Sequence, residues 1–191
     1  MSRNLGTQVT DYFDCAVRLS SSRLDALQLR KFADAQMPGN GIGEVPWSTP
    51  LSSDQLSQLA TDGKAEFVTA QMMLAADCEP PLLGIGALIR DPDNYPVPRM
   101  IIVVESDSRG QGIGVRIANE IINRLKPGEA IQAEVQQENS THRRIARFFE
   151  NLGFECVDEN HRTGNVPEYV AGTLAGTVQK KFALYQCIKP A

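Results

Sequence analysis

The clearest hydrophobic pattern lies in the middle of the chain. The β-branched run 101–104 is typical of a buried strand. Polar residues 105–108 and a glycine-rich stretch follow it, and apolar side chains then recur at helical spacing from Ile113 to Leu125. The Pro-Gly pair at 127–128 ends that spacing. The pattern predicts a strand, a glycine-rich turn and a helix, in that order.

Similar patterns predict further elements on both sides of this unit. Turn residues such as Pro80-Pro81 and Asp91-Pro92 separate the apolar runs, and segment 38–50 has the composition of a loop. We expect strands at 9–19, 67–75, 82–90, 130–135 and 181–188, a strand that ends at Val104, and a short strand near Cys156. We expect helices at about 22–37, 52–60, 113–125 and 141–151. Strands that alternate with helices predict an α/β fold.

The glycine-rich turn has the features of an anion-binding turn. Glycines allow close approach of the backbone, and the free N–H groups at a helix start favour an anion. A P-loop is excluded because no Lys-Ser or Lys-Thr follows Gly114, and the dinucleotide pattern fails because its third glycine is Val115. The pattern [Q/R]-x-x-G-x-[G/A] is met by Arg109, Gly112 and Gly114. An ordinary turn with glycines for packing is the other interpretation.

Composition narrows the class of protein. With 191 residues the chain is long enough for one domain with a substantial core, and a net charge of −4 argues against a general nucleic-acid binder. The apolar run 82–89 is too short to span a membrane, and residues 1–13 lack the apolar region of a signal peptide, so we expect a cytoplasmic protein. Four cysteines without a C-x-x-C pair and only two histidines predict no metal site and buried free thiols.

Three features together resemble the GNAT superfamily of N-acetyltransferases. They are the turn motif at 109–114, the segment RFFENLGFECV with Gly153-Phe154, and the element order β-α-α-β-β-β-α-β-α-β-β. The segment Leu83–Leu88 resembles the third strand of that family. The resemblance covers about residues 10–188 and is most specific at 98–157. It implies one domain over 1–191, with a mixed sheet of about six to seven strands, about four flanking helices, and a splay between strands four and five.

The same resemblance implies a site for acetyl-CoA as co-substrate. Backbone groups of the strand before the turn would pair with the pantetheine arm, and the turn would hold the pyrophosphate. The implied pantetheine positions are Ile102, Val103 and Val104, and the implied pyrophosphate positions are Arg109, Gly110, Gln111, Gly112, Ile113, Gly114 and Val115. A neutral amine would then attack the thioester directly, after a base has removed its proton.

Candidates for the base and the acid are few. Glu105 directly follows the central strand, and His142 stands at the spacing where the family has an asparagine, which is displaced here to Asn139. Glu134 faces either the substrate cleft or an exposed surface. Phe149 occupies the position where the family often has a tyrosine acid, so the usual acid is missing. Tyr169, in an expected loop after the sixth strand, is a further candidate acid.

The acceptor is not identified by the sequence. Family resemblance places acceptor contacts at about 24–60, including Trp47, and at 158–180, where the polar segment 160–165 would form a mobile rim. The expected reaction acetylates a small-molecule amine or a protein amine. A non-catalytic acyl-CoA-binding or sensing module on the same fold is the alternative. Apolar groups on both faces of strand 181–188 also favour a homodimer, although burial of the sheet in one monomer explains them equally well.

Overall fold

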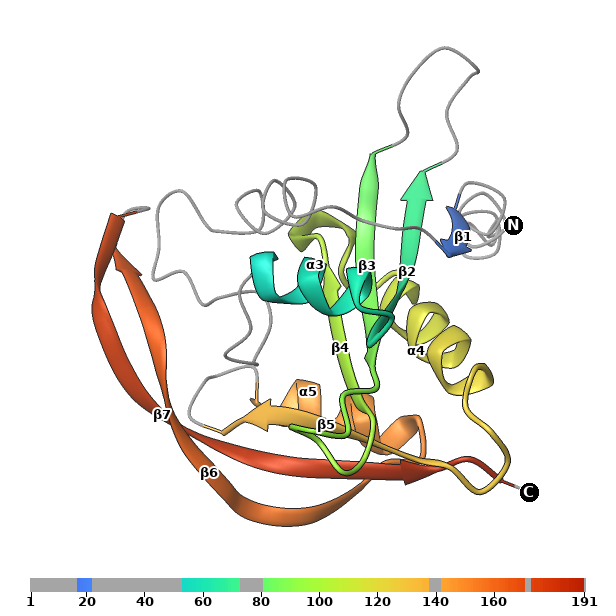
Figure 1. Ribbon diagram of the computed structural model, residues 1–191. Coiled ribbons are helices and arrows are strands. Elements are labelled where there is room, and N and C mark those ends of the chain that lie inside the picture. Colours follow the sequence, from blue (N-terminus) through green and yellow to red (C-terminus); the bar gives the residue numbers. More distant parts are fainter. Residues whose placement is uncertain (1–16, 22–52, 73–80, 138–141, 171–172, 191) are drawn as a thin grey trace, which may run out of the picture.

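The computed structural model describes residues 17–21, 53–72, 81–137, 142–170 and 173–190. Its seven strands form one sheet in the order β1-β2-β3-β4-β5-β7-β6 (Figure 1). The strands are β1 (Val17–Ser21), β2 (Ala65–Met72), β3 (Leu82–Ile89), β4 (Arg99–Val104), β5 (Ala130–Gln136), β6 (Glu155–Val170) and β7 (Thr173–Ile188). The helices of the described residues are α3 (Ser53–Thr61), α4 (Ile113–Asn123), α5 (His142–Asn151) and a short 3-10 turn, η1 (Ser106–Ser108).

Two apolar layers cover the two faces of the sheet, because side chains alternate along each strand. On one face, Leu56 of α3 packs with Ile101 and Val103 of β4. On the other face, Met100 of β4 packs with Ile117 of α4, and the same cluster includes residues of α5. Figure 1 shows α3 in front of the sheet. Only the pair β4–β5 is parallel within the sheet, which is therefore mixed, as the sequence predicts.

Strands β4 and β5 separate soon after they meet. Their register contains a single pair, Arg99 with Gln132, and Gln132 N–H donates to the carbonyl of Pro98 at 2.8 Å. From Met100 onward β4 is paired with β3 on its other edge. The predicted splay between the fourth and fifth strands is confirmed within the described strands.

Helix α4 lies directly on the backbone of β3, where two glycines leave room for it. A Cβ at Gly86 would overlap with Cγ2 of Ile117 and would lie 2.7 Å from Cδ1 of Ile121. At Gly84 a Cβ would lie 2.9 Å from Cδ1 of Ile117. The close approach fixes the depth of α4 against the sheet, and hence the position of its first turn.

We therefore expect Gly86→Ala to destabilise the fold by about 1–3 kcal/mol, because overpacking forces α4 outward. The double variant Gly86→Ala/Ile117→Ala removes the overlapping methyl groups and should be less destabilised than the sum of its two single variants. Urea unfolding of the four proteins measures this coupling. Strict additivity would contradict the packing described for α4.

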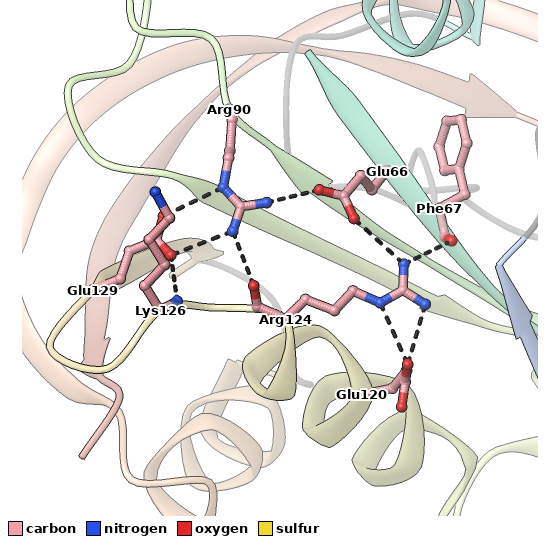
Figure 2. Close-up of polar contacts among 7 residues, drawn as sticks. All are labelled: Glu66, Phe67, Arg90, Glu120, Arg124, Lys126 and Glu129. Carbon is pink, nitrogen blue, oxygen red and sulfur yellow. Dashed lines mark hydrogen bonds and ion pairs between the residues drawn. The ribbon is translucent and has the colours of Figure 1, made fainter. Parts of the chain in front are cut away.

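A charged network ties the end of α4 to the sheet (Figure 2). Arg90, just after β3, pairs with Glu66 of β2 at 2.8 Å and with Glu129 at 3.3 Å. Arg124, just after α4, pairs with Glu120 at 3.2 Å and with Glu66 at 3.7 Å. Glu66 therefore joins both guanidiniums at a half-exposed surface.

Strands β6 and β7 correct the sequence prediction most strongly. The short strand expected near Cys156 runs for 16 residues, and β7 also has 16 residues instead of beginning at Lys181. The polar segment 160–165, expected as a mobile rim, belongs to β6, as does Tyr169. Figure 1 shows the two strands as a long curved ribbon. Such a ribbon is held by backbone pairing and exposes much of β6, so it lacks the apolar alternation that predicts a strand.

Smaller corrections concern the N-terminal third and the thiols. Strand β1 includes Ser20 and Ser21, expected as a helix cap, because backbone pairing with β2 does not depend on these side chains. The expected helix at 22–37 and Trp47 lie outside the described residues. Cys187 is buried as expected, but Cys156 is exposed on β6.

Most apolar side chains on the two faces of β7 are buried within the monomer. Phe182, Leu184, Ala183 and Tyr185 are all buried within the chain. Intramolecular packing therefore accounts for most of the pattern on which the expected homodimer rested, while Ile188 at the end of β7 is 59% exposed. None of the helices in the described ranges is long and apolar enough to cross a membrane.

Candidate functional site: the turn before α4 and the splay beside it

The turn before α4 has the backbone conformation that only glycine adopts easily. Gly110 has φ +82° and Gly112, the N-cap of α4, has φ +79°. No side chain caps this helix start, and its first turn has no acidic residue. The first intrahelical bond joins Arg116 N–H to the Gly112 carbonyl at 3.1 Å. The N–H groups of residues 113–115 precede that bond and are the donors that an anion would use.

This helix start lies at the carboxyl end of β4. A Cβ at Gly114 would make ordinary contacts, 3.5 Å from Cγ2 of Val104 and 3.4 Å from Cε2 of Phe148 in α5. A Cβ at Gly110 or Gly112 would have no atom of the described chain within 4 Å. Residues of β4 and α5 thus pack against the turn at Gly114, whereas the space next to the two left-handed glycines is open.

Polar side chains of the turn form hydrogen bonds with other residues between Val104 and Gln111. Arg109 Nε donates to the carbonyl of Val104 at 3.1 Å, and Gln111 Nε2 donates to that of Asp107 at 3.2 Å. Ser108 Oγ donates to Glu105 Oε2 at 2.9 Å. The carboxylate of Glu105 therefore helps to shape the 3-10 turn between β4 and α4.

The structure brings the expected coenzyme A residues together. Positions 102–104 form the end of β4 next to the splay, and 109–115 form the turn and helix start that continue from it. Their binding role stays a prediction. His142 is the first residue of α5, but its side chain lies outside the described part of the chain, as do Asn139 and the side chain of Tyr169.

Phe149 is buried in the core on the α4–α5 side of the sheet. Its ring packs edge to face against Phe148 at 5.1 Å and Phe154 at 5.2 Å, and it stacks on Tyr185 at 6.2 Å between ring centroids. Burial raises the pKa of Tyr185. Phe149 is thus a core residue, and the missing tyrosine at this position is poor evidence for the loss of catalysis.

Glu134 is the centre of a charged cluster on the α3 face of the sheet. Its side chain is only 8% exposed, so the two interpretations left open by the sequence, an open cleft and an exposed face, are both replaced by an enclosed ion pair. Arg162 Nε and Nη2 donate to its Oε2 at 2.9 and 2.5 Å. His161 Nε2 lies 3.4 Å and Arg99 Nη1 lies 3.5 Å from its Oε1. We call Arg99, Glu134, His161 and Arg162 the Glu134 cluster.

Sequence reasoning singled out Glu134, missed Arg99, and placed His161 and Arg162 only within a polar rim in a region of expected acceptor contacts. Arg99 begins β4, and His161 and Arg162 lie in the segment expected to be a loop. The signal available was weak: Glu134 is flanked in β5 by the apolar residues Ala133 and Val135, and an enclosed carboxylate requires a partner. The partner could not be read from the sequence, because β6 reaches β5 only through β7.

The solved structures that this chain resembles include acetyltransferases. A putative acetyltransferase of the GNAT family from Desulfovibrio desulfuricans is 19% identical, with a TM-score of 0.57, 91% of this chain covered and 99% of the other. Spermidine N-acetyltransferase from Vibrio cholerae, in complex with CoA and spermine, is 18% identical, with a TM-score of 0.54 and coverages of 92% and 96%. The ribosomal-protein-S18-alanine N-acetyltransferase from Escherichia coli is 14% identical, with a TM-score of 0.51 and coverages of 92% and 95%.

No family model matches the sequence, and no curated protein matches it. The structural likeness shows the fold: this chain has the GNAT fold, as the motifs of its central segment predict.

Proposed function

We propose that this chain is a single-domain N-acyltransferase that moves an acetyl group from acetyl-CoA to an amine. The observation that carries the proposal is the uncapped start of α4 at the splay of β4 and β5. Gly112 supplies a left-handed N-cap without a side chain, and the N–H groups of the first turn precede the first intrahelical bond. A diphosphate is the ligand that this arrangement suits.

The surroundings of the turn also suit a long polyanion with a flexible arm. Arg143, Arg144 and Arg147 are exposed on α5, the helix whose Phe148 borders the start of α4. Their positive charge favours the phosphates of coenzyme A. Strand β4 beyond Arg99 has no partner on its β5 side within the described strands, so its backbone groups suit pairing with the amides of a pantetheine arm.

Acetyl transfer by this chain requires orientation and one proton transfer. The turn and β4 would hold the thioester at the splay, where a neutral amine from the α3 face attacks the carbonyl carbon. Glu105, at the end of β4, and His142, at the start of α5, are the candidate groups for moving the proton. Acceptors of the similar proteins, spermidine and a ribosomal protein, show that both small-molecule and protein amines are known for this fold.

The test is thiol release from acetyl-CoA in the presence of amine panels. We expect turnover with at least one amine class, and coenzyme A binding measurable by calorimetry. Binding without turnover for any amine would favour the alternative, an acyl-CoA-binding or sensing module. Absence of coenzyme A binding would contradict both proposals, because each depends on the turn before α4.

A further inference from the structure

The Glu134 cluster contains more positive than negative charge. Two guanidiniums, those of Arg99 and Arg162, share the single carboxylate of Glu134. Asp158 lies 3.7 Å from Nδ1 of His161, but it is half exposed and stands at the rim. Within these four residues guanidiniums outnumber carboxylates, and such a local excess of positive charge favours an anion.

Arg99 also has hydrogen-bond donors that the described chain does not use. Its side chain is 12% exposed, and its Nε and Nη1 are enclosed without a hydrogen-bond partner in the described part of the chain. The 3.5 Å approach of Nη1 to Glu134 lacks hydrogen-bond geometry. Unused donors on an enclosed guanidinium carry a free-energy cost, which a second carboxylate would remove through paired N–H···O bonds.

The position of the cluster relates these donors to the proposed reaction. Glu134 lies two residues beyond Gln132, the last β5 residue paired with β4, and therefore at the mouth of the splay. Its side chain points to the α3 face, opposite the face covered by α4, because Ala133 and Val135 pack into the α4 layer. We infer that the Glu134 cluster binds the carboxylate of the amine acceptor, so that the acceptor class is amino acids and other amines that carry a carboxylate. This inference rests on the proposed acetyl transfer.

Neighbouring residues hold the guanidiniums in place for such a ligand. The Arg162 guanidinium stacks over the Phe182 ring at 4.0 Å, and a Cβ at Gly164 would overlap with its Nη1. The Arg99 guanidinium lies 5.3 Å from the ring centroid of Tyr95, which covers it and is itself only half-buried. Arg162, at 26% exposure, reaches the surface.

Matched acceptors provide the first test. Thiol release from acetyl-CoA is compared for the standard L-amino acids, their α-amides and spermidine. The α-amide has a less basic amine, and hence more of the reactive neutral form near pH 8, so it should react faster if the carboxylate is not bound. We expect instead that kcat/KM for the best amino acid exceeds that of its amide by about tenfold or more. Equal or faster reaction of the amide, or preference for spermidine, would overturn the inference.

Variants of the cluster provide the second test. Arg162→Lys keeps the charge but loses the planar fork, and Gly164→Ala displaces the guanidinium without removing it. Both should raise KM for the amino acid by about tenfold while KM for acetyl-CoA stays unchanged. Lys126→Met, which removes an exposed cation outside the cluster, is the control and should behave as wild type. An unchanged amino-acid KM in both cluster variants would contradict carboxylate binding.

Calorimetry separates this inference from the proposed function. The full chain, saturated with coenzyme A, is titrated with the amino acids and with their amides. Binding of an acid that is weakened in Arg162→Lys supports the carboxylate site even if no acceptor is turned over. If acetyl transfer occurs but no acid is preferred in kinetics or in binding, the acetyltransferase proposal stands and the carboxylate site is wrong.

Discussion

Gly112→Val is expected to abolish coenzyme A binding while the fold persists. Two physical effects act together at this position. A β-branched residue is strained at φ +79°, and its side chain would occupy the space through which a diphosphate approaches the first-turn N–H groups. We expect calorimetry to show an affinity loss of about a hundredfold or more, equivalent to about 3 kcal/mol.

Gly63→Val is the matched control for this prediction. Gly63 has φ +72° and, like Gly112, has no described atom within 4 Å of an added Cβ, but it lies in the turn between α3 and β2. Both variants should lose a similar amount of stability in urea unfolding, because each carries the same backbone strain. Only Gly112→Val should lose coenzyme A affinity. Equal affinities in the two variants would refute the anion-binding role of the turn.

Glu134→Gln is expected to cause a large loss of stability. Removal of the carboxylate charge takes away the ion-pair partner that the guanidiniums of Arg99 and Arg162 share in a largely enclosed position. Breaking one partner of such a pair costs about 3–5 kcal/mol. Urea unfolding monitored by circular dichroism measures the change in the free energy of unfolding.

Glu66→Gln is the matched comparison, because Glu66 also joins two arginines (Figure 2). The difference is exposure: the Glu66 side chain is 51% exposed, whereas that of Glu134 is 8% exposed. Solvent and salt screen the exposed network, so we expect a loss of about 1 kcal/mol or less. A cost as large as that of Glu134→Gln would show that burial does not govern the strength of these networks.

Short-range patterns predicted the central part of the fold well. The run ending at Val104, the glycine turn and the periodic apolar residues of α4 correspond to β4, the turn and α4 almost residue for residue. These elements are buried on well-defined faces, so each leaves a clear period in the sequence. The same stretch also contains the residues expected to bind coenzyme A, because a turn and the helix that follows it are contiguous.

The Glu134 cluster could not be predicted in the same way. Its members come from β4, β5 and β6, and β6 is adjacent to β5 only through β7. The pairing depends on register: Phe182 lies opposite Gln136 in β5 and opposite Arg162 in β6. No local pattern encodes such a register. The polar residues of β6 also lack the apolar alternation by which a strand is predicted from sequence.

The sequence by itself therefore determined the α/β class and the turn before α4, because those features follow from local periodicity, glycine positions and element order, and the resemblance to a known family added the splayed centre. Only the tertiary structure decided where the charges of β4, β5 and β6 meet, that Phe149 packs in the core, and that β6 and β7 extend as a long ribbon. The physical reason is that ion pairs and strand register are set by contacts between residues distant in the chain, and these contacts form only when the sheet is assembled.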